Sequence, residues 1–170
     1  MIGGTEWEND PPYPDSIATN AAALMLGFIN ESDHNLDEKG RLVIPQRHRA
    51  AFASGFVLTR GLDGCLWLWP LPTFESVQEQ IRPASILDEP TRNLERLLYT
   101  GLDGKLDQQG RLTIPASLRK YAGIGSDGQV VLLGSRRRLE VWSPERWDAV
   151  TQRLPADAAS ASEQIRVTLM

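Results

Sequence analysis

Two short segments of this 170-residue chain carry the residues whose types and spacing could do chemistry. Residues 36–49 align without gaps on residues 106–119, and eight of the fourteen positions are identical, where typical residue frequencies predict about one. Each copy holds an Asp, a Gly, an Arg directly after that Gly, and a second Arg: Asp37, Gly40, Arg41 and Arg49 in the first copy, and Asp107, Gly110, Arg111 and Arg119 in the second. Both arginines stand in both copies, while Glu38, Lys39 and Val43 differ from their counterparts. The repeat therefore presents positive charge in a fixed geometry.

The Asp and the Gly of each copy predict a tight turn that places the Arg. An Asp side chain can accept hydrogen bonds from the backbone that follows it, and Gly adopts the positive φ that a tight reversal requires. The strand predicted over 41–44 puts Leu42 and Ile44 on one face and Arg41 on the other. Two interpretations stay open: Arg41 contacts a partner, or it forms an ion pair with Asp37 that holds the turn.

The same order of elements is predicted after each turn. Pro45 ends the first strand and precedes a helix over 46–53. Apolar runs on either side of a turn then predict two hairpins, over 56–59 with 66–69 and over 130–133 with 139–142.

Amphipathic helices are predicted to close each copy and to connect the two. The closing helices are capped by Thr73 in the first copy and by Ser143 in the second, and each shows apolar residues at i, i+3 and i+7. The connecting helix is capped by Asp88. Its expected buried stripe consists of Leu94, Leu97 and Leu98.

The chain is predicted to form two similar units that fold around one another. A unit of about 45 residues buries too little apolar surface to fold alone, so the two units complete one another's core about an approximate two-fold axis. The fold class is mostly β with short α-helices, an α+β arrangement. The predicted order is a disordered acidic tail (1–24), a first domain (28–78), a helical connector (79–101), a second domain (102–150) and a C-terminal tail (155–170).

Composition disfavours several classes of protein. Hydrophobic residues make up 41% and charged residues 24% of the chain, which argues against wholesale disorder, collagen and coiled coil. No apolar run reaches the roughly 18 residues of a membrane span. A single cysteine, Cys65, cannot form an internal disulfide, and with two histidines it makes a poor zinc set. We therefore expect a cytoplasmic protein without metal or cofactor.

Charge is distributed unevenly along the chain. The net charge of −4, taken alone, disfavours nucleic acid as a partner. Residues 1–33 carry −6 and contain no Lys or Arg, so the rest of the chain holds 18 basic and 16 acidic side chains, a balance of +2. The body of the protein is thus mildly basic, with its arginines in clusters.

Other candidate groups give weaker signals. His34 stands beside Asp33, but no nucleophile follows at a recognisable spacing, so no catalytic residue is assigned. His48 lies among arginines, which favours a surface or DNA-facing role over a metal role. Residues 136–138 are three arginines at a predicted hairpin tip, where a solvated turn and a contact with a partner both stay open. Four tryptophans are expected to pack in the core: Trp67, Trp69, Trp142 and Trp147.

Several further residues match the pattern of a known family. They are Gly27-Phe28, the stretch 36–42 with Ile44-Pro45, and the leucine-rich connector. Together with the two Asp-to-Arg copies, they make residues 25–155 resemble the MraZ family of bacterial transcriptional regulators. The resemblance implies two AbrB-like swapped-hairpin units that form a pseudo-two-fold double-psi-type barrel, and assembly into a ring-shaped homo-oligomer. It also implies binding to double-stranded DNA at repeated sites upstream of the division and cell-wall gene cluster, including its own promoter.

The resemblance also implies which residues contact DNA. The basic residues after each turn, Lys39, Arg41 and Arg111, are expected to touch it. Three neighbouring cations complete the expected set: Arg47, Arg49 and Arg119. The second copy has Gln109 in place of Lys39, so the two copies are expected to contribute unequally.

Residues 1–24 depart from the family pattern. Family members usually begin close to the position of Gly27, and Met25 lies just before it. The segment is therefore expected to be either a tail peculiar to this protein or the result of a start codon assigned too early. Its charge of −4 is expected to lower the affinity of the protein for DNA.

Two functions from different classes stay open. The leading hypothesis is a sequence-specific DNA-binding transcriptional regulator on the nucleoid, without catalysis. The competing hypothesis is an oligomeric interaction scaffold without specific DNA binding, which the overall acidity favours. The sequence identifies neither the DNA site nor the number of subunits.

Overall fold

The computed structural model describes residues 27–84 and 87–158 of the chain. The acidic tail predicted over 1–24 lies outside the described residues, as does the C-terminal segment from 159 onward. Residues 155–158, predicted to be unstructured, are instead helical, and the N–H of Asp157 donates to the carbonyl of Arg153 at 3.1 Å. Alanine, the strongest helix former, supplies two of these four residues.

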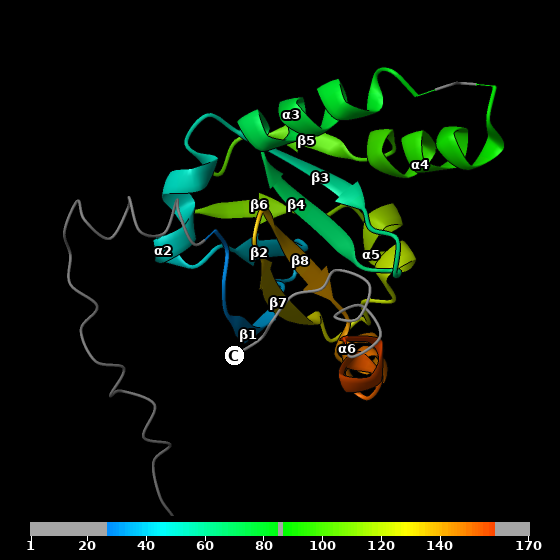
Figure 1. The fold of residues 1–170 in the computed structure, drawn as a ribbon. Coiled ribbons are helices and arrows are strands. Elements are labelled where there is room, and N and C mark those ends of the chain that lie inside the picture. Colours follow the sequence, from blue (N-terminus) through cyan, green and yellow to red (C-terminus); the bar gives the residue numbers. More distant parts are fainter. Residues whose placement is uncertain (1–26, 85–86, 159–170) are drawn as a thin grey trace, which may run out of the picture.

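Six antiparallel strands form the main sheet (Figure 1). In sequence order they are β1 (Glu31–Asn35), β3 (Phe56–Arg60), β4 (Leu66–Pro70), β5 (Leu102–Gly104), β7 (Gln129–Ser135) and β8 (Arg138–Trp142). Their order across the sheet is β1-β7-β8-β4-β3-β5. The two predicted hairpins are confirmed as β3–β4 and β7–β8, and they meet where Leu68 lies opposite Leu139.

The two copies of the repeat exchange strands. β1 belongs to the first copy and pairs with β7 of the second, so that Asp33 lies opposite Val131. β5 belongs to the second copy and pairs with β3 of the first, so that Asp103 lies opposite Val57. Neither β1 nor β5 is predicted from the sequence, because neither shows apolar alternation. The shared core expected of the two units is built through this exchange.

A separate antiparallel ribbon consists of β2 (Arg41–Val43) and β6 (Arg111–Thr113). Leu42 lies opposite Leu112 and both are buried, so the ribbon packs one face into the core. Each strand leads through a proline into a short helical segment. These segments are α2 (Gln46–Arg49) with the 3-10 turn η1 (Ala50–Phe52), and α5 (Ala116–Ala122). The helix predicted over 46–53 is therefore present as α2 and η1.

Strand residues alternate between two buried layers, one on each face of the sheet. In the first layer, Leu58 and Leu139 pack with the ribbon residue Leu42. The second layer contains the four tryptophans for which packing was predicted, and all of them are buried: Trp67, Trp69, Trp142 and Trp147.

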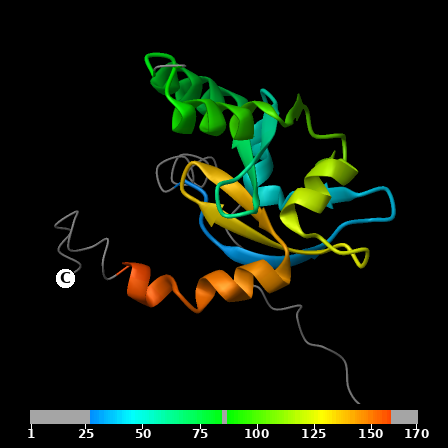
Figure 2. The same cartoon turned by 90° about the vertical axis from the view of Figure 1, so that its right-hand side faces the viewer.

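Three helices contribute to the second layer: α3 (Leu71–Ile81), α4 (Glu89–Tyr99) and α6 (Pro144–Thr151). Their buried residues in this layer are Phe74, Leu98 and Trp147. Figures 1 and 2 show α3 and α4 side by side, with α6 at the opposite end of the sheet. The predicted connector helix is α4, in which Leu98 is buried and Leu94 and Leu97 are half-buried.

Two of the three predicted helix caps are confirmed. Asp88 Oδ2 accepts from the Thr91 N–H at 3.0 Å, and Ser143 Oγ accepts from the Arg146 N–H at 3.4 Å. The third prediction is wrong, because Thr73 lies inside α3, which begins at Leu71. A proline at position 72 suits the first helical turn, so the helix starts earlier than the cap pattern suggests.

The fold is an antiparallel sheet with short helices, which confirms the α+β class. The prediction that it is mostly β is wrong, because helical residues outnumber strand residues in the described part of the chain. The pairings among the described residues leave the sheet open at β1 and β5, so the double-psi barrel is not confirmed. Within residues 27–84 and 87–158, no helix is long and apolar enough to cross a membrane.

Candidate nucleic-acid interface

The first Asp-to-Arg turn is closed by the carboxylate of Asp37. Its Oδ1 accepts from the backbone N–H groups of Lys39 and Arg41, both at 3.0 Å. Its Oδ2 accepts from Nε of Arg41 at 2.6 Å. Gly40, at φ +72°, makes the reversal that this geometry requires.

The second turn repeats the first. Asp107 Oδ1 accepts from the backbone N–H groups of Gln109 and Arg111, both at 2.9 Å, and Oδ2 accepts from Nε of Arg111 at 2.8 Å. The ion pair that the sequence leaves open is therefore present in both copies. It engages only Nε, and among the described residues the terminal Nη1 and Nη2 groups of Arg41 and Arg111 have no hydrogen-bond partner.

Hydrogen bonding lowers the pKa of both carboxylates. The main cause is the backbone N–H of Arg41 for Asp37 and that of Arg111 for Asp107. A carboxyl whose folded pKa is lowered contributes stability above its ordinary pKa, and this contribution is lost as the pH falls through the folded pKa. The turns are thus held at neutral pH and loosened by strong acid.

The β2–β6 ribbon brings the two arginines onto one face. Arg41 lies opposite Thr113, and Val43 lies opposite Arg111. By strand alternation these four side chains share the face opposite to the two buried leucines. Arg41 and Arg111 are diagonal neighbours, and the Cα atoms of such a pair lie about 7–8 Å apart. Val43, at 44% exposure, and the exposed Thr113 accompany them on this face.

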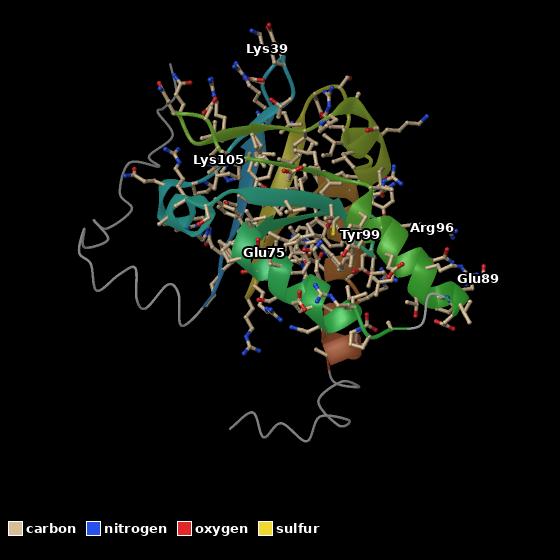
Figure 3. All side chains as sticks on the ribbon, turned by 90° about the horizontal axis from the view of Figure 1, so that it is seen from above. Lys39, Glu75, Glu89, Arg96, Tyr99 and Lys105 are labelled. Atoms are coloured by element: carbon tan, nitrogen blue, oxygen red, sulfur yellow. The ribbon has the colours of Figure 1, made fainter. Side chains whose placement is uncertain are left out.

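Two further predicted DNA contacts stand beside the first turn. Lys39 is exposed at the tip of this turn, which projects away from the body of the molecule (Figure 3). Arg47 is exposed on α2 and donates from Nε to Nε2 of His48 at 3.1 Å. The second copy has Gln109 and Ser117 at the matching positions. The first copy therefore has two cations that the second lacks at matching positions, with Glu38 offsetting one of them, although the geometry of the two turns is the same.

The last two predicted contacts, Arg49 and Arg119, are placed differently. Both are half-buried. Nε of Arg49 donates to the backbone carbonyl of Ile44 at 2.7 Å. Arg119 lies against Gly40, and its Nε is buried with no hydrogen-bond partner among the described residues. Both guanidinium groups therefore contact the protein itself.

The ribbon adds residues that the sequence analysis does not single out. Val43 and Thr113 join the interface only through the pairing of β2 with β6, which was not predicted. Lys105 is exposed and, with Arg49 and Gln108, lines a shallow hollow of about 210 Å³ beside the second turn. The signal that could have found the ribbon is the repeat itself, because equivalent segments meet one another across a two-fold axis.

The two histidines are engaged in local packing. His34 shares a 2.9 Å hydrogen bond with Oγ of Ser32, and burial lowers the pKa of the imidazole. The ring of His48 lies edge-on to that of Phe28 with centroids 5.3 Å apart, and burial lowers its pKa to about 4. Both imidazoles are therefore neutral at pH 7.

The interpretation of residues 136–138 as a fully solvated turn is wrong for Arg138. Its guanidinium lies 4.2 Å from the ring centroid of Trp67 and donates to Glu140 at 2.6 Å, so it is engaged in the second layer.

Burial raises the pKa of the Cys65 thiol to about 12, which makes it a poor nucleophile. In the part of the chain that the structure describes, no group of three or more His, Cys, Asp or Glu is placed to hold a metal ion.

Comparison with known proteins identifies the family. The family model described as "MraZ protein, putative antitoxin-like" matches residues 28–97 and 103–169. The protein named Transcriptional regulator MraZ from Roseiflexus castenholzii is 41% identical over 139 residues, which cover 81% of this chain and 96% of that protein. The chain belongs to the MraZ family. A protein of the same name from Deinococcus radiodurans is 39% identical over 130 residues, which cover 76% of this chain and 90% of that protein.

Membership of the MraZ family gives the broad role of the chain. The relatives are named as transcriptional regulators and not as enzymes, and this chain is a transcriptional regulator. The MraZ family model matches in two segments, each of which contains one Asp-to-Arg turn.

Proposed function

We propose that this protein regulates transcription by binding specific DNA sequences through its β2–β6 ribbon. The observation that carries the proposal is the placement of Arg41 and Arg111 on one ribbon face, each held through Nε by an Asp. The exposed cations Lys39 and Arg47 beside this face are proposed phosphate contacts. The regulatory role of the MraZ family supports the same assignment.

An arginine held through Nε is well suited to reading a base. The Asp fixes the guanidinium and leaves Nη1 and Nη2 as two adjacent donors. Guanine presents two adjacent acceptors, O6 and N7, in the major groove, and their bidentate contact with Arg is the commonest specific contact between proteins and DNA. Because the ion pair already restricts the side chain, less conformational entropy is lost on binding.

The ribbon also has a shape that the major groove admits. The Cα atoms of its two arginines are expected about 7–8 Å apart, which is close to two steps of 3.4 Å along a DNA strand. Val43 and Thr113 are available for apolar contact with a thymine methyl group. One chain therefore reads only a few base pairs.

Few base contacts per chain require several chains to act together. We infer that the protein assembles into a ring whose subunits bind repeated sites, because linked binding events raise the overall affinity by about 10²–10⁴ without new contacts. The proposed target is the promoter of the division and cell-wall gene cluster, including the protein's own gene. This function places the protein on the nucleoid in the cytoplasm.

The overall acidity of the chain favours the second candidate function, an oligomeric scaffold that does not bind specific DNA. The net charge is −4, and residues 1–33 alone carry −6. Long-range attraction to phosphate is therefore weak, and the proposed DNA binding must come from the local cations of the ribbon.

Gel-shift titration with the upstream DNA of the gene distinguishes the two functions. DNA binding predicts tighter binding to duplexes with repeated sites than to a single site, and a steep fall of affinity with salt. Oligomer mass measured on the same sample tests the ring. A large oligomer that fails to bind this DNA at low salt would support the scaffold, and equal affinity for single and repeated sites would contradict the cooperative ring.

A further inference from the structure

Each Asp-to-Arg turn is in contact with an arginine from the other copy of the repeat. Arg49 belongs to the first copy, yet it lies against Gly110 of the second, where an added Cβ would overlap its guanidinium and lie 2.7 Å from its Cδ. Arg119 belongs to the second copy, yet its Cζ lies 3.2 Å from the place that a Cβ on Gly40 would occupy. The two contacts are reciprocal.

Backbone hydrogen bonds also join the turn of each copy to the residue that follows the ribbon strand of the other copy. The N–H of Ile44 donates to the carbonyl of Gly110 at 2.9 Å, and the N–H of Ile114 donates to the carbonyl of Gly40 at 2.8 Å. Nε of Arg49 donates to the carbonyl of Ile44 at 2.7 Å. Arg49 therefore touches both the residue that follows β2 and the turn that precedes β6, and it fixes one against the other.

Burial separates these two arginines from the exposed cations Lys39 and Arg47, whereas Arg41 and Arg111 are half-buried as well. Arg49 and Arg119 are half-buried, whereas Lys39 is exposed. The glycines that they lie against, Gly40 and Gly110, are buried although they belong to turns. Glycine is thus required there both for its positive φ and for the space that the guanidinium occupies.

We propose that Arg49 and Arg119 are positioning residues, each of which holds the recognition turn of the opposite copy. This assignment replaces the sequence-based expectation that both contact DNA. Each turn then depends on one arginine of the opposite copy, because loosening either arginine alters only the turn that it contacts. The consequence for DNA rests on the proposed function, but the contact itself is present in the DNA-free protein.

Amide hydrogen exchange of the full DNA-free chain tests the contact directly. Arg49→Ala should speed exchange at residues 109–111 by about tenfold and leave residues 39–41 within about twofold, because only the second turn loses its support. Arg119→Ala should give the opposite pattern. Equal acceleration in both turns, or acceleration confined to the turn of the same copy, would overturn the proposal.

A double-mutant cycle tests the consequence for DNA binding. Arg49→Ala should weaken binding about tenfold. This cost should vanish when Arg111 is already Ala and persist when Arg41 is already Ala, because Arg49 acts through the second turn. Measurement at low salt keeps the DNA affinity of each variant within the measurable range, since phosphate contacts then support binding. An equal cost in both backgrounds would assign Arg49 a direct DNA contact and reject the positioning role.

Two further variants serve as controls. Arg49→Lys keeps the charge but loses Nε and the planar group, so it should behave like Arg49→Ala, whereas recovery of binding would indicate a phosphate contact. Arg47→Ala removes an exposed arginine from the same helix and should leave exchange in both turns unchanged. If Arg41→Ala still binds DNA normally while the exchange pattern holds, the proposed function fails and the positioning role stands.

Discussion

The two copies of the repeat share one turn geometry and differ in the charges placed around it. The three hydrogen bonds to each Asp agree between copies within 0.2 Å. The first copy adds Lys39 and Arg47, while the second has Gln109 and Ser117. Asp, Gly and Arg therefore suffice for the turn, and the surrounding charge varies independently of it.

The second copy also carries a contact that ties it to the first. Arg146 on α6 donates from Nη1 to the carbonyls of Gly64 and Tyr121, both at 2.6 Å. Gly64 belongs to the first copy and Tyr121 to the second. When Phe74 is aligned with Trp147, the counterpart of Arg146 is Thr73, whose side chain is too short to span such a distance. The copies thus differ in stabilising contacts as well as in charge.

Arg41→Ala is expected to have the largest effect of any single change. The side chain lies on the exposed ribbon face, so its loss opens no core cavity, and each lost DNA contact costs about 1–3 kcal/mol. Several chains acting together multiply this loss, so binding to repeated sites should fall below detection in a gel shift at physiological salt, and should be measurable only at low salt. Arg111→Ala should be milder, because its turn lacks a counterpart of Lys39.

Thermal stability and oligomer mass are the controls for the variants Arg41→Ala and Arg111→Ala. An exposed ion pair contributes about 0–1 kcal/mol, so both variants should melt close to the parent temperature. Normal DNA binding by folded Arg41→Ala protein would remove Arg41 from the interface. A greater loss from Arg111→Ala would reverse the proposed order of the two copies.

Arg146→Ala is expected to produce the next largest effect, on folding rather than on DNA binding. The change removes a charged donor from two carbonyl groups, and the free energy of unfolding should fall by about 2–4 kcal/mol. Urea denaturation measures the loss. Arg153→Ala, which removes an exposed arginine just beyond the end of α6, is the matched control. Equal stability of the two variants would contradict a tie between the copies.

Exchanging Lys39 and Gln109 between the two turn tips tests whether charge at this position affects DNA affinity. Lys39→Gln should weaken DNA binding by about 1 kcal/mol and reduce the salt slope by about one, and Gln109→Lys should do the reverse. Affinity measured over a range of salt concentrations checks both. Gln108→Lys adds a cation one position earlier in the second turn. If it tightens binding as much as Gln109→Lys, the tip position has no special role.

The sequence predicts the parts of the fold that depend on local patterns. Both hairpins and the caps at Asp88 and Ser143 follow from such patterns. β1 could not be found in this way, because Glu31–Asn35 contains no apolar residue and is stabilised by hydrogen bonds to the distant strand β7. An exchanged edge strand leaves no periodic signal in its own sequence.

The same distinction, between local patterns and contacts with distant segments, applies to the candidate site. Spacing alone predicts the turn of Asp37 and the exposed face of Arg41, because both depend on residues within the turn. The placement of Arg49 could not be predicted, since its contact, Gly110, lies in the other copy. A cation near a recognition turn resembles a DNA contact in the sequence, whichever role it has in the fold.

The smallest expected effect concerns His48, whose counterpart in the second copy is the buried Leu118. Burial lowers the pKa of His48 from 6.5 to about 4, so the unfolded chain takes up a proton below pH 6.5 while the folded protein does not. Stability should therefore fall as the pH drops from 6.5 toward 4, by about 1 kcal/mol once solvent screening of this half-buried group is allowed for.

His48→Leu places the residue of the second copy in the first and should remove this part of the pH dependence. The quantity to measure is the difference in unfolding free energy between variant and parent, from denaturation series over the range of roughly pH 4.5 to 7.5 within which the imidazole titrates. His34 and the carboxyl groups are present in both proteins, so their contributions cancel in the difference. The free energy of unfolding of the variant should rise relative to that of the parent as the pH falls. A difference that stays constant with pH would show that folding does not alter the proton affinity of His48.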